Sequence, residues 1–191
     1  MHYYLAHSMN LTWVQFFTFI SNSSNPEPQI VISLLVFIIL YLMNNKLEAI
    51  CCAFNICATG LTNLILKNIV KRFRPVGIHL IDAHGYSFPS GHASISTAIA
   101  IVLIYFMFKR MKNKKTAYIL SSLVIIYLIL VAISRVYLGV HYPTDILGGW
   151  VIAVIWSYIT ISTYKFCIRK GVNKFLDKYF TIKLNIFKNK S

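Results

Sequence analysis

Residues 85 to 108 read GYSFPSGHASISTAIAIVLIYFMF, a short polar stretch that leads directly into an apolar run. Similar runs recur along the chain, and each is long enough to span or nearly span a bilayer, which takes about 20 helical residues. The shorter ones need flanking residues or a tilted path. The five runs are Gln29 to Met43, Leu47 to Leu66, Ala93 to Phe108, Ala117 to Ile133 and Ile146 to Phe166.

The composition favours the bilayer as solvent. Of 191 residues, 57% are hydrophobic and only 13% are charged, with a mean hydropathy of +0.63. These values lie far from those of soluble domains. We therefore predict an all-α fold, a polytopic transmembrane helical bundle of five or six spans.

The N-terminal stretch LTWVQFFTFISN sets Thr12, Gln15 and Thr18 three residues apart among apolar side chains. This spacing favours an amphipathic helix that lies in the membrane interface, although a sixth, tilted span is the alternative. The predicted organisation is thus an N-terminal interfacial segment over 1–28, a transmembrane domain over 29–166 and a basic cytoplasmic tail over 167–191.

The net charge of +14 could indicate nucleic-acid binding, but the placement of the charges argues against it. Five of the 19 basic residues lie between Lys109 and Lys115, and eight lie from Lys165 onward, both beside apolar runs. The positive-inside rule places these segments in the cytoplasm. The loops Lys67–Gly91 and Ser134–Asp145 then face outward, although they also carry cations. We predict a multi-pass protein of the cell membrane whose reactive loops are extracytoplasmic.

The first outer loop opens with KNIVKRFRP, residues 67 to 75. Lys67 and Arg74 are two helical turns apart, so both would project from one face if the helix continued until Pro75 ended it. A basic helix end that reaches toward the membrane surface is the simpler interpretation.

The same loop ends at Ser90, Gly91 and His92. Ser90 is a favourable N-cap and Gly91 permits close approach of the backbone, so the free N–H groups that begin the next helix would form an anion site beside His92. A plain cap with an incidental histidine is the alternative for this short motif.

The second outer loop, SRVYLGVHYPTDILGG, spans residues 134 to 149. His141 and Asp145 are four residues apart around Pro143, which can begin a helix, so the carboxylate can orient the imidazole. Arg135 adds a permanent cation. Taken alone, Asp145 could simply favour a first helical turn, and His141 could be an interfacial histidine.

Together the two loops gather three cations, two histidines, one acid and an amide-rich cap. This set suits a phosphate, and a phosphate ester held this way invites phosphoryl transfer. One histidine would attack phosphorus while the other protonates the leaving oxygen. The residues leave the order of the two histidines open and favour His141 as nucleophile only through Asp145.

The sequence resembles the type 2 phosphatidic acid phosphatase family, the lipid phosphate phosphatases, over roughly residues 29 to 166. The family pattern has three parts. They are matched by Lys67 with Arg74-Pro75, by Pro89-Ser90-Gly91-His92, and by Ser134-Arg135 with His141 and Asp145.

The resemblance implies that His141 is the nucleophile, Asp145 its orienting partner and His92 the acid. It implies that the phosphate is held by Lys67, Arg74, Arg135, Ser90 and Gly91, and that neither a metal nor another cofactor takes part. It also implies a phosphohistidine intermediate.

The expected substrate is a membrane lipid phosphate, which could be phosphatidic acid, phosphatidylglycerophosphate or undecaprenyl pyrophosphate. A non-catalytic binder or transporter of anionic lipids and a vanadium-dependent peroxidase are the alternatives. Other polar residues of the first outer loop, namely Lys71, Arg72, His79, Asp82 and His84, are expected to have surface roles or to attract headgroups. The cysteines show no CxxC pairing, so neither a metal knuckle nor a disulfide framework is indicated.

Overall fold

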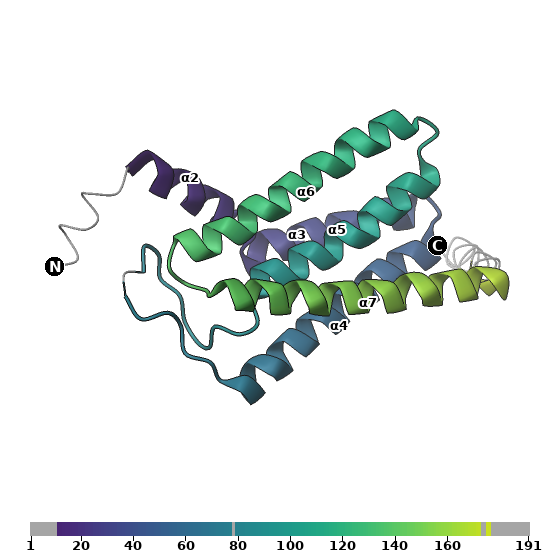
Figure 1. Cartoon of the computed structure of the whole chain (residues 1–191). Helices are drawn as coiled ribbons and strands as arrows, with labels where there is room; N and C mark the ends of the chain where they lie inside the picture. Colours follow the sequence, from purple (N-terminus) through teal and green to yellow (C-terminus); the bar gives the residue numbers. More distant parts are fainter. Residues whose placement is uncertain (1–10, 78, 173–174, 177–191) are drawn as a thin grey trace, which may run out of the picture.

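The computed structural model describes residues 11–77, 79–172 and 175–176, and within these residues it contains helices and no strands (Figure 1). Residues 1–10 of the predicted N-terminal segment lie outside the described residues, as do 173–174 and 177–191 of the predicted basic tail. The helices are α2 (Leu11–Asn22), α3 (Pro26–Leu42), α4 (Lys46–Val70), α5 (Gly91–Arg110), α6 (Lys114–Tyr137) and α7 (Pro143–Arg169).

Apart from Met43, which follows the end of α3, the five apolar runs lie within helices of the bundle, which confirms the predicted fold class. Helices α4, α5, α6 and α7 are each long and apolar enough to cross a membrane. Helices α2 and α3 meet this criterion only together, as a pair bent by 46° across a short break. The described residues therefore provide five crossings if the bent pair counts as one.

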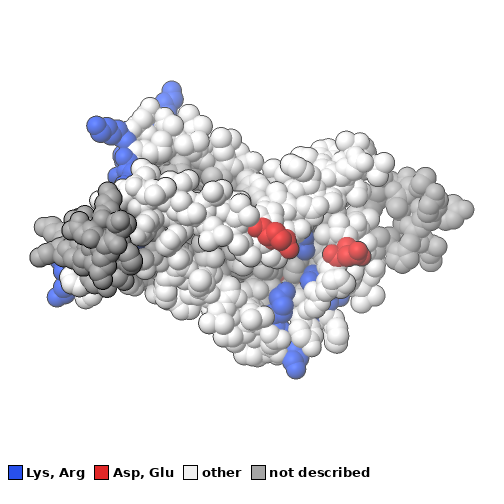
Figure 2. Space-filling view, turned by 180° about the vertical axis from the view of Figure 1, so that it is seen from behind, with Lys and Arg blue, Asp and Glu red and all other residues white. Residues whose placement is uncertain are grey.

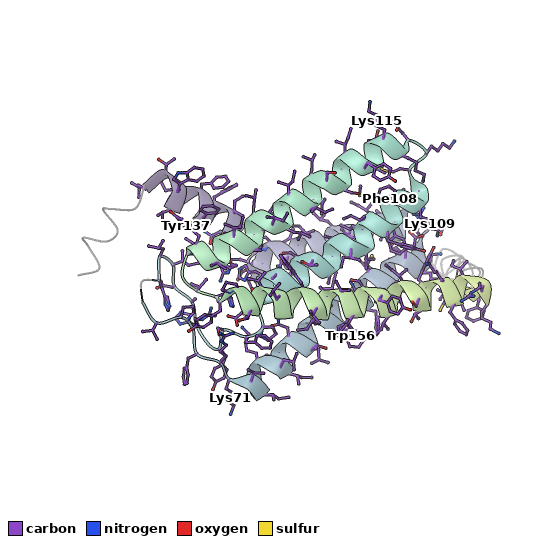
Figure 3. All side chains as sticks on the ribbon, in the orientation of Figure 1. Lys71, Phe108, Lys109, Lys115, Tyr137 and Trp156 are labelled. Atoms are coloured by element: carbon purple, nitrogen blue, oxygen red, sulfur yellow. The ribbon has the colours of Figure 1, made fainter. Side chains whose placement is uncertain are left out.

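Consecutive long helices run in opposite directions, so both predicted outer loops lie at the same end of the bundle. In Figure 3, Lys71 and Tyr137 mark this end, while Lys109 and Lys115 lie at the other. We call the first end the site end. Basic side chains gather toward both ends of the molecule in Figure 2, and the surface between them is uncharged in that view. This distribution is typical of a bundle with an apolar belt.

Polar side chains link the helices inside the bundle. Asn55 of α4 donates to the carbonyl oxygen of Ala98 (2.9 Å) and to Ser157 Oγ (3.3 Å), while Asn63 donates to Ser94 Oγ (3.0 Å). Such bonds between transmembrane helices contribute modestly to association and fix which helix faces meet. They hold α4, α5 and α7 in one rotational arrangement.

Gly149 lets α5 and α7 approach closely near the site end. A Cβ atom at this position would lie 2.9 Å from the carbonyl oxygen of Ser90 and 3.1 Å from the main-chain nitrogen of Ser94. Both are backbone atoms that cannot turn away. The small residue therefore allows the N-terminal ends of α5 and α7 to lie against each other.

The opposite end is held by a buried carboxylate. Glu48, only 3% exposed, accepts hydrogen bonds from Lys109 (3.0 Å), Arg110 (2.7 Å) and the hydroxyl of Tyr164 (2.8 Å). A buried charge of this kind is tolerated because several donors surround it. The cluster joins the start of α4 to α5 and α7.

Candidate active site

The starts of α5 and α7 meet at the centre of the site end. The main-chain N–H of Ser90 donates to the carbonyl oxygen of Asp145 over 3.0 Å. Ser90 caps α5, and its Oγ accepts a hydrogen bond from the nitrogen of Ala93, so the predicted N-cap is confirmed. Gly91 is the first residue of the helix. The motifs on the two loops therefore lie beside each other.

His141 and Asp145 form a buried pair at the start of α7, as their spacing predicts. Nδ1 of His141 lies 3.3 Å from Oδ2 of Asp145, and the two residues are 3% and 0% exposed. The same carboxylate oxygen accepts from the main-chain nitrogen of Tyr142 (2.9 Å), and Pro143 begins the helix as expected. With the Nδ1 proton directed at the carboxylate, Nε2 of His141 keeps its lone pair.

Burial keeps this imidazole neutral. It lowers the pKa of His141 from 6.5 to about 4, and the hydrogen bond that the ring donates to Asp145 opposes the shift only in part. A neutral ring with a free Nε2 is the form that can act as a nucleophile or base near pH 7.

Arg72 lies against Asp145, which differs from its expected role at the surface. Its Nη1 donates to Oδ1 of Asp145 (3.0 Å) and to Oγ1 of Thr144 (2.6 Å), and its guanidinium lies 3.9 Å from the centre of the Tyr142 ring. The carboxylate thus has a permanent cation on one oxygen and His141 on the other. Neighbouring Lys71 is exposed, as expected.

Arg74 does not continue the helix that carries Lys67. Helix α4 ends at Val70, and Lys71 adopts a left-handed conformation. The carbonyl oxygen of Arg72 then accepts a hydrogen bond from the main-chain N–H of Ser87 over 2.8 Å. The predicted helix through Arg74 is therefore wrong, because contacts with the returning loop replace its last turn.

Arg74 instead joins the two outer loops. It donates to the carbonyl oxygens of His84 (2.7 Å), Gly85 (3.1 Å) and Val140 (2.8 Å). Lys67 also donates one hydrogen bond to this loop, from Nζ to the carbonyl oxygen of Tyr86 (2.8 Å). Each cation retains further N–H groups for a ligand.

Arg135, only 4% exposed, is the most deeply buried of the predicted phosphate-binding cations. Its Nη1 donates to Oγ of Ser21, whereas its Nε has no hydrogen-bond partner within the described part of the chain. A buried guanidinium N–H without a partner is costly unless a ligand or water accepts it.

His92 contacts a residue that the sequence analysis did not consider. Its Nε2 lies 2.9 Å from Oδ1 of Asn25, in the break between α2 and α3. Ser21 and Asn25 thus bring a third segment to the site. The signal in the sequence for this contribution is the polar composition of residues 21 to 25, SNSSN. That composition is also typical of an ordinary linker.

Three polar residues of the first loop stay at its surface. His79, Asp82 and His84 are exposed; the His79 ring contacts the carbonyl oxygen of Pro75, and His84 contributes its carbonyl oxygen to Arg74. No group of three or more His, Cys, Asp or Glu that could hold a metal ion occurs among the described residues. The site is therefore a cationic cluster with two histidines and one carboxylate.

The sequence is similar to a known protein family and to characterised relatives. The sequence model of the PAP2 superfamily matches residues 48–169. The chain is 38% identical over 103 residues to phosphatidylglycerophosphatase B of Bacillus subtilis, a match that covers 52% of this chain and 49% of that protein. It is also 38% identical over 103 residues to undecaprenyl-diphosphatase of Sulfolobus acidocaldarius, covering 51% and 46%. The matches thus span about half of each relative.

A solved structure supports the same relationship. The crystal structure of a transmembrane PAP2 type phosphatidylglycerolphosphate phosphatase from Bacillus subtilis superposes with a TM-score of 0.73 at 25% identity. The superposition covers 82% of this chain and 79% of that one. The likeness therefore extends over the bundle and not only over the motifs.

Proposed function

The chain belongs to the PAP2 superfamily, and from this premise we propose that it is a membrane lipid phosphatase. It removes the terminal phosphate of a lipid phosphate or pyrophosphate. The observation that carries the proposal is the buried pair of His141 and Asp145 beside the capped start of α5. A binder or transporter of anionic lipids needs the cations but has no use for an imidazole oriented by a carboxylate.

The phosphate is held by groups that converge from three segments. Lys67, Arg74 and Arg135 supply positive charge, with the unpaired Nε of Arg135 as the most deeply buried donor. The N–H groups at the start of α5, next to Ser90 and Gly91, add the positive end of the helix dipole. These donors match a compact oxyanion better than a carboxylate or an uncharged headgroup.

Catalysis then proceeds in two displacements. Nε2 of His141 attacks phosphorus while the bond to the leaving oxygen breaks, and protonated His92 gives its proton to that oxygen. A lipid alcohol departs from a lipid phosphate, and a lipid monophosphate departs from a pyrophosphate. Water next attacks the phosphohistidine. His92 takes a proton from the water, the P–N bond breaks, and inorganic phosphate leaves with His141 neutral again. Asp145 keeps the His141 ring in the reactive tautomer throughout.

The position of the two histidines also suggests where the lipid tail lies. In-line displacement places the leaving oxygen opposite His141, on the side of His92. One turn below His92, an apolar groove of about 490 Å³ runs between α3, α4 and α5. Its lining includes Pro26, Ile30, Ile56 and Ile95. A hydrocarbon chain in this groove would place its phosphate at the site end.

The proposed location is the cell membrane, with the site end on the extracytoplasmic side. The support is the concentration of basic residues at the opposite end, in Lys109 to Lys115 and in the sequence after Lys165. Lipid phosphates of the outer leaflet would then reach the pocket without crossing the bilayer.

The test is release of inorganic phosphate by purified protein in mixed micelles that contain phosphatidic acid, phosphatidylglycerophosphate or undecaprenyl pyrophosphate. The assay is run with EDTA, where activity should persist, and with vanadate, which should inhibit. Relatives named for two of these lipids both match at 38% identity over 103 residues, so the turnover ranking identifies the substrate. Binding of all three without phosphate release favours a lipid binder, and halide oxidation with vanadate favours a peroxidase.

A further inference from the structure

Asn25 occupies a helix-capping position without capping the helix. It is the N-cap residue of α3, and asparagine is among the best residues there because its Oδ1 accepts a hydrogen bond from the second or third helical N–H. No such bond forms. The third helical residue is Pro28, which has no N–H to donate. The sequence NPEP thus leaves the amide oxygen of Asn25 available for another donor.

That donor is His92. Nε2 of the ring lies 2.9 Å from Oδ1 of Asn25, across 67 residues of sequence, and both residues are partly buried. With the amide oxygen as acceptor, the Nε2 position carries a proton. Nδ1 is then the ring nitrogen left to act on the substrate.

A second contact, from the adjoining last turn of α2, supports a role in the site. Ser21 is fully buried and accepts a hydrogen bond from Arg135. The last turn of α2 and the break that follows it thus contact both the predicted acid and a predicted phosphate-binding cation. It lies before residue 48, where the match to the family begins, so neither contact follows from membership of the family.

We propose that Asn25 is a positioning residue for His92, an inference that rests on the proposed phosphatase function. The side-chain oxygen Oδ1 of Asn25 accepts a hydrogen bond from the Nε2–H of His92, and this directs Nδ1 at the leaving oxygen. In the first displacement the Nδ1 proton passes to that oxygen as the P–O bond breaks and the bond from His141 to phosphorus forms. In the second, Nδ1 takes a proton from the attacking water.

The choice of an amide suits this task. His141 keeps its ring neutral and partnered by a carboxylate, as a nucleophile requires. His92 must release and recover a proton in each cycle, and a neutral acceptor orients the ring without holding the proton as strongly as a carboxylate would. An uncharged partner also adds no negative charge beside the incoming phosphate.

The kinetic test compares two substrates in isosteric variants. Asn25→Leu removes the acceptor and should lower kcat for the lipid phosphate about tenfold or more, a part of the roughly 10²- to 10⁴-fold value of a general acid. It should leave kcat for an aryl phosphate with an acidic phenol nearly unchanged, since that leaving group needs no proton. Asn68→Leu on α4 is the matched control, since its exposed side chain donates to the carbonyl oxygen of Leu64 in the same helix.

Asn25→Asp carries the test if the leucine variant folds poorly. A carboxylate favours the protonated ring, so the alkaline limb of the pH–rate profile should move to higher pH while activity toward the lipid is kept. Equal losses with both substrates and an unchanged profile would mean that Asn25 only supports the fold, and would overturn the inference.

A spectroscopic measurement separates this inference from the proposed function. Nitrogen chemical shifts of histidine-labelled protein in nanodiscs report which ring nitrogen is protonated, and His92→Gln assigns the signal among the six histidines. We expect the Nε2–H form in the wild type and a mixture in Asn25→Leu. The same tautomer in both overturns the role of Asn25 even if no lipid phosphate is hydrolysed.

Discussion

Ser90 and Asp145 are joined through their backbones: the N–H that precedes α5 donates to a carbonyl oxygen in the first turn of α7, over 3.0 Å. The residue that caps the proposed anion-binding helix start and the residue whose carboxylate contacts His141 are therefore parts of one hydrogen-bonded unit. A shift of α5 relative to α7 would disturb both at once.

Gly149→Ala tests this coupling. The added methyl group would meet the carbonyl oxygen of Ser90 at 2.9 Å, and overpacking of this kind costs about 1–3 kcal/mol. The better helix propensity of alanine offsets only about 1 kcal/mol. We expect a lower thermal unfolding midpoint and lower phosphatase activity. Gly60→Ala is the control, because its Cβ would lie 4.0 Å from Ile95 Cδ1. Equal behaviour of the two variants would contradict the close α5–α7 contact.

The two histidines are distinguished by leaving group. His141→Ala should abolish the covalent phosphoenzyme, measured by rapid quench with labelled substrate, because the oriented nucleophile is lost. His92→Ala should slow cleavage of the lipid by roughly 10²- to 10⁴-fold. The loss in rate should be smaller when the leaving group is an acidic phenol. Recovery of His141→Ala, but not of His92→Ala, by the acidic phenol would reverse the two roles.

Arg72→Ala should impair catalysis although Arg72 lies outside the family motifs. Its guanidinium bonds Oδ1 of Asp145 at 3.0 Å, so its loss leaves that buried oxygen without its cation. Because the Arg72 side chain is 36% exposed, we expect only about a tenfold loss in kcat/KM. Lys71→Ala, which removes a neighbouring exposed charge, should have little effect. Similar losses in both variants would point to the general charge of the loop.

The titration of His141 should be displaced to acid. Burial lowers its pKa from 6.5 to about 4, so the folded protein binds fewer protons there than the unfolded chain between these values. The resulting stability is complete above pH 6.5 and is lost as the pH falls toward 4. An NMR titration of the His141 ring in the ligand-free protein should have its midpoint near pH 4. A midpoint at 6.5 would show that the ring is solvated.

The sidedness of the bundle can be measured with single cysteines. In a background that lacks Cys51, Cys52, Cys57 and Cys167, we introduce Asp82→Cys at the site end or Lys112→Cys at the other. A membrane-impermeant maleimide added to intact cells should label the first and not the second, because the basic end is retained in the cytoplasm. The opposite pattern would place the active site inside the cell.

The sequence was sufficient for the parts of the site that depend on local geometry. Asp145 lies four residues after His141 at a helix start, and Ser90 immediately precedes one, so both contacts follow from helix geometry. The end of α4 could not be predicted, because it depends on a contact distant in sequence. The main-chain N–H of Ser87, on the returning loop, donates a hydrogen bond to the carbonyl oxygen of Arg72. The role of Asn25 was also hidden, since its contact spans 67 residues.

The hydrogen bond between Ser90 and Asp145 also bears on how the protein is made. Residues of α4, α5 and α6 enter the membrane before the chain reaches Asp145, yet the Ser90 N–H has no native partner until α7 is in place. A chain interrupted after α6 holds the cations and His92 but lacks both His141, the proposed nucleophile, and the Asp145 carboxylate that contacts it. The proposed hydrolysis can therefore begin only once α7 has been inserted, and the rate of its appearance during synthesis reports that step.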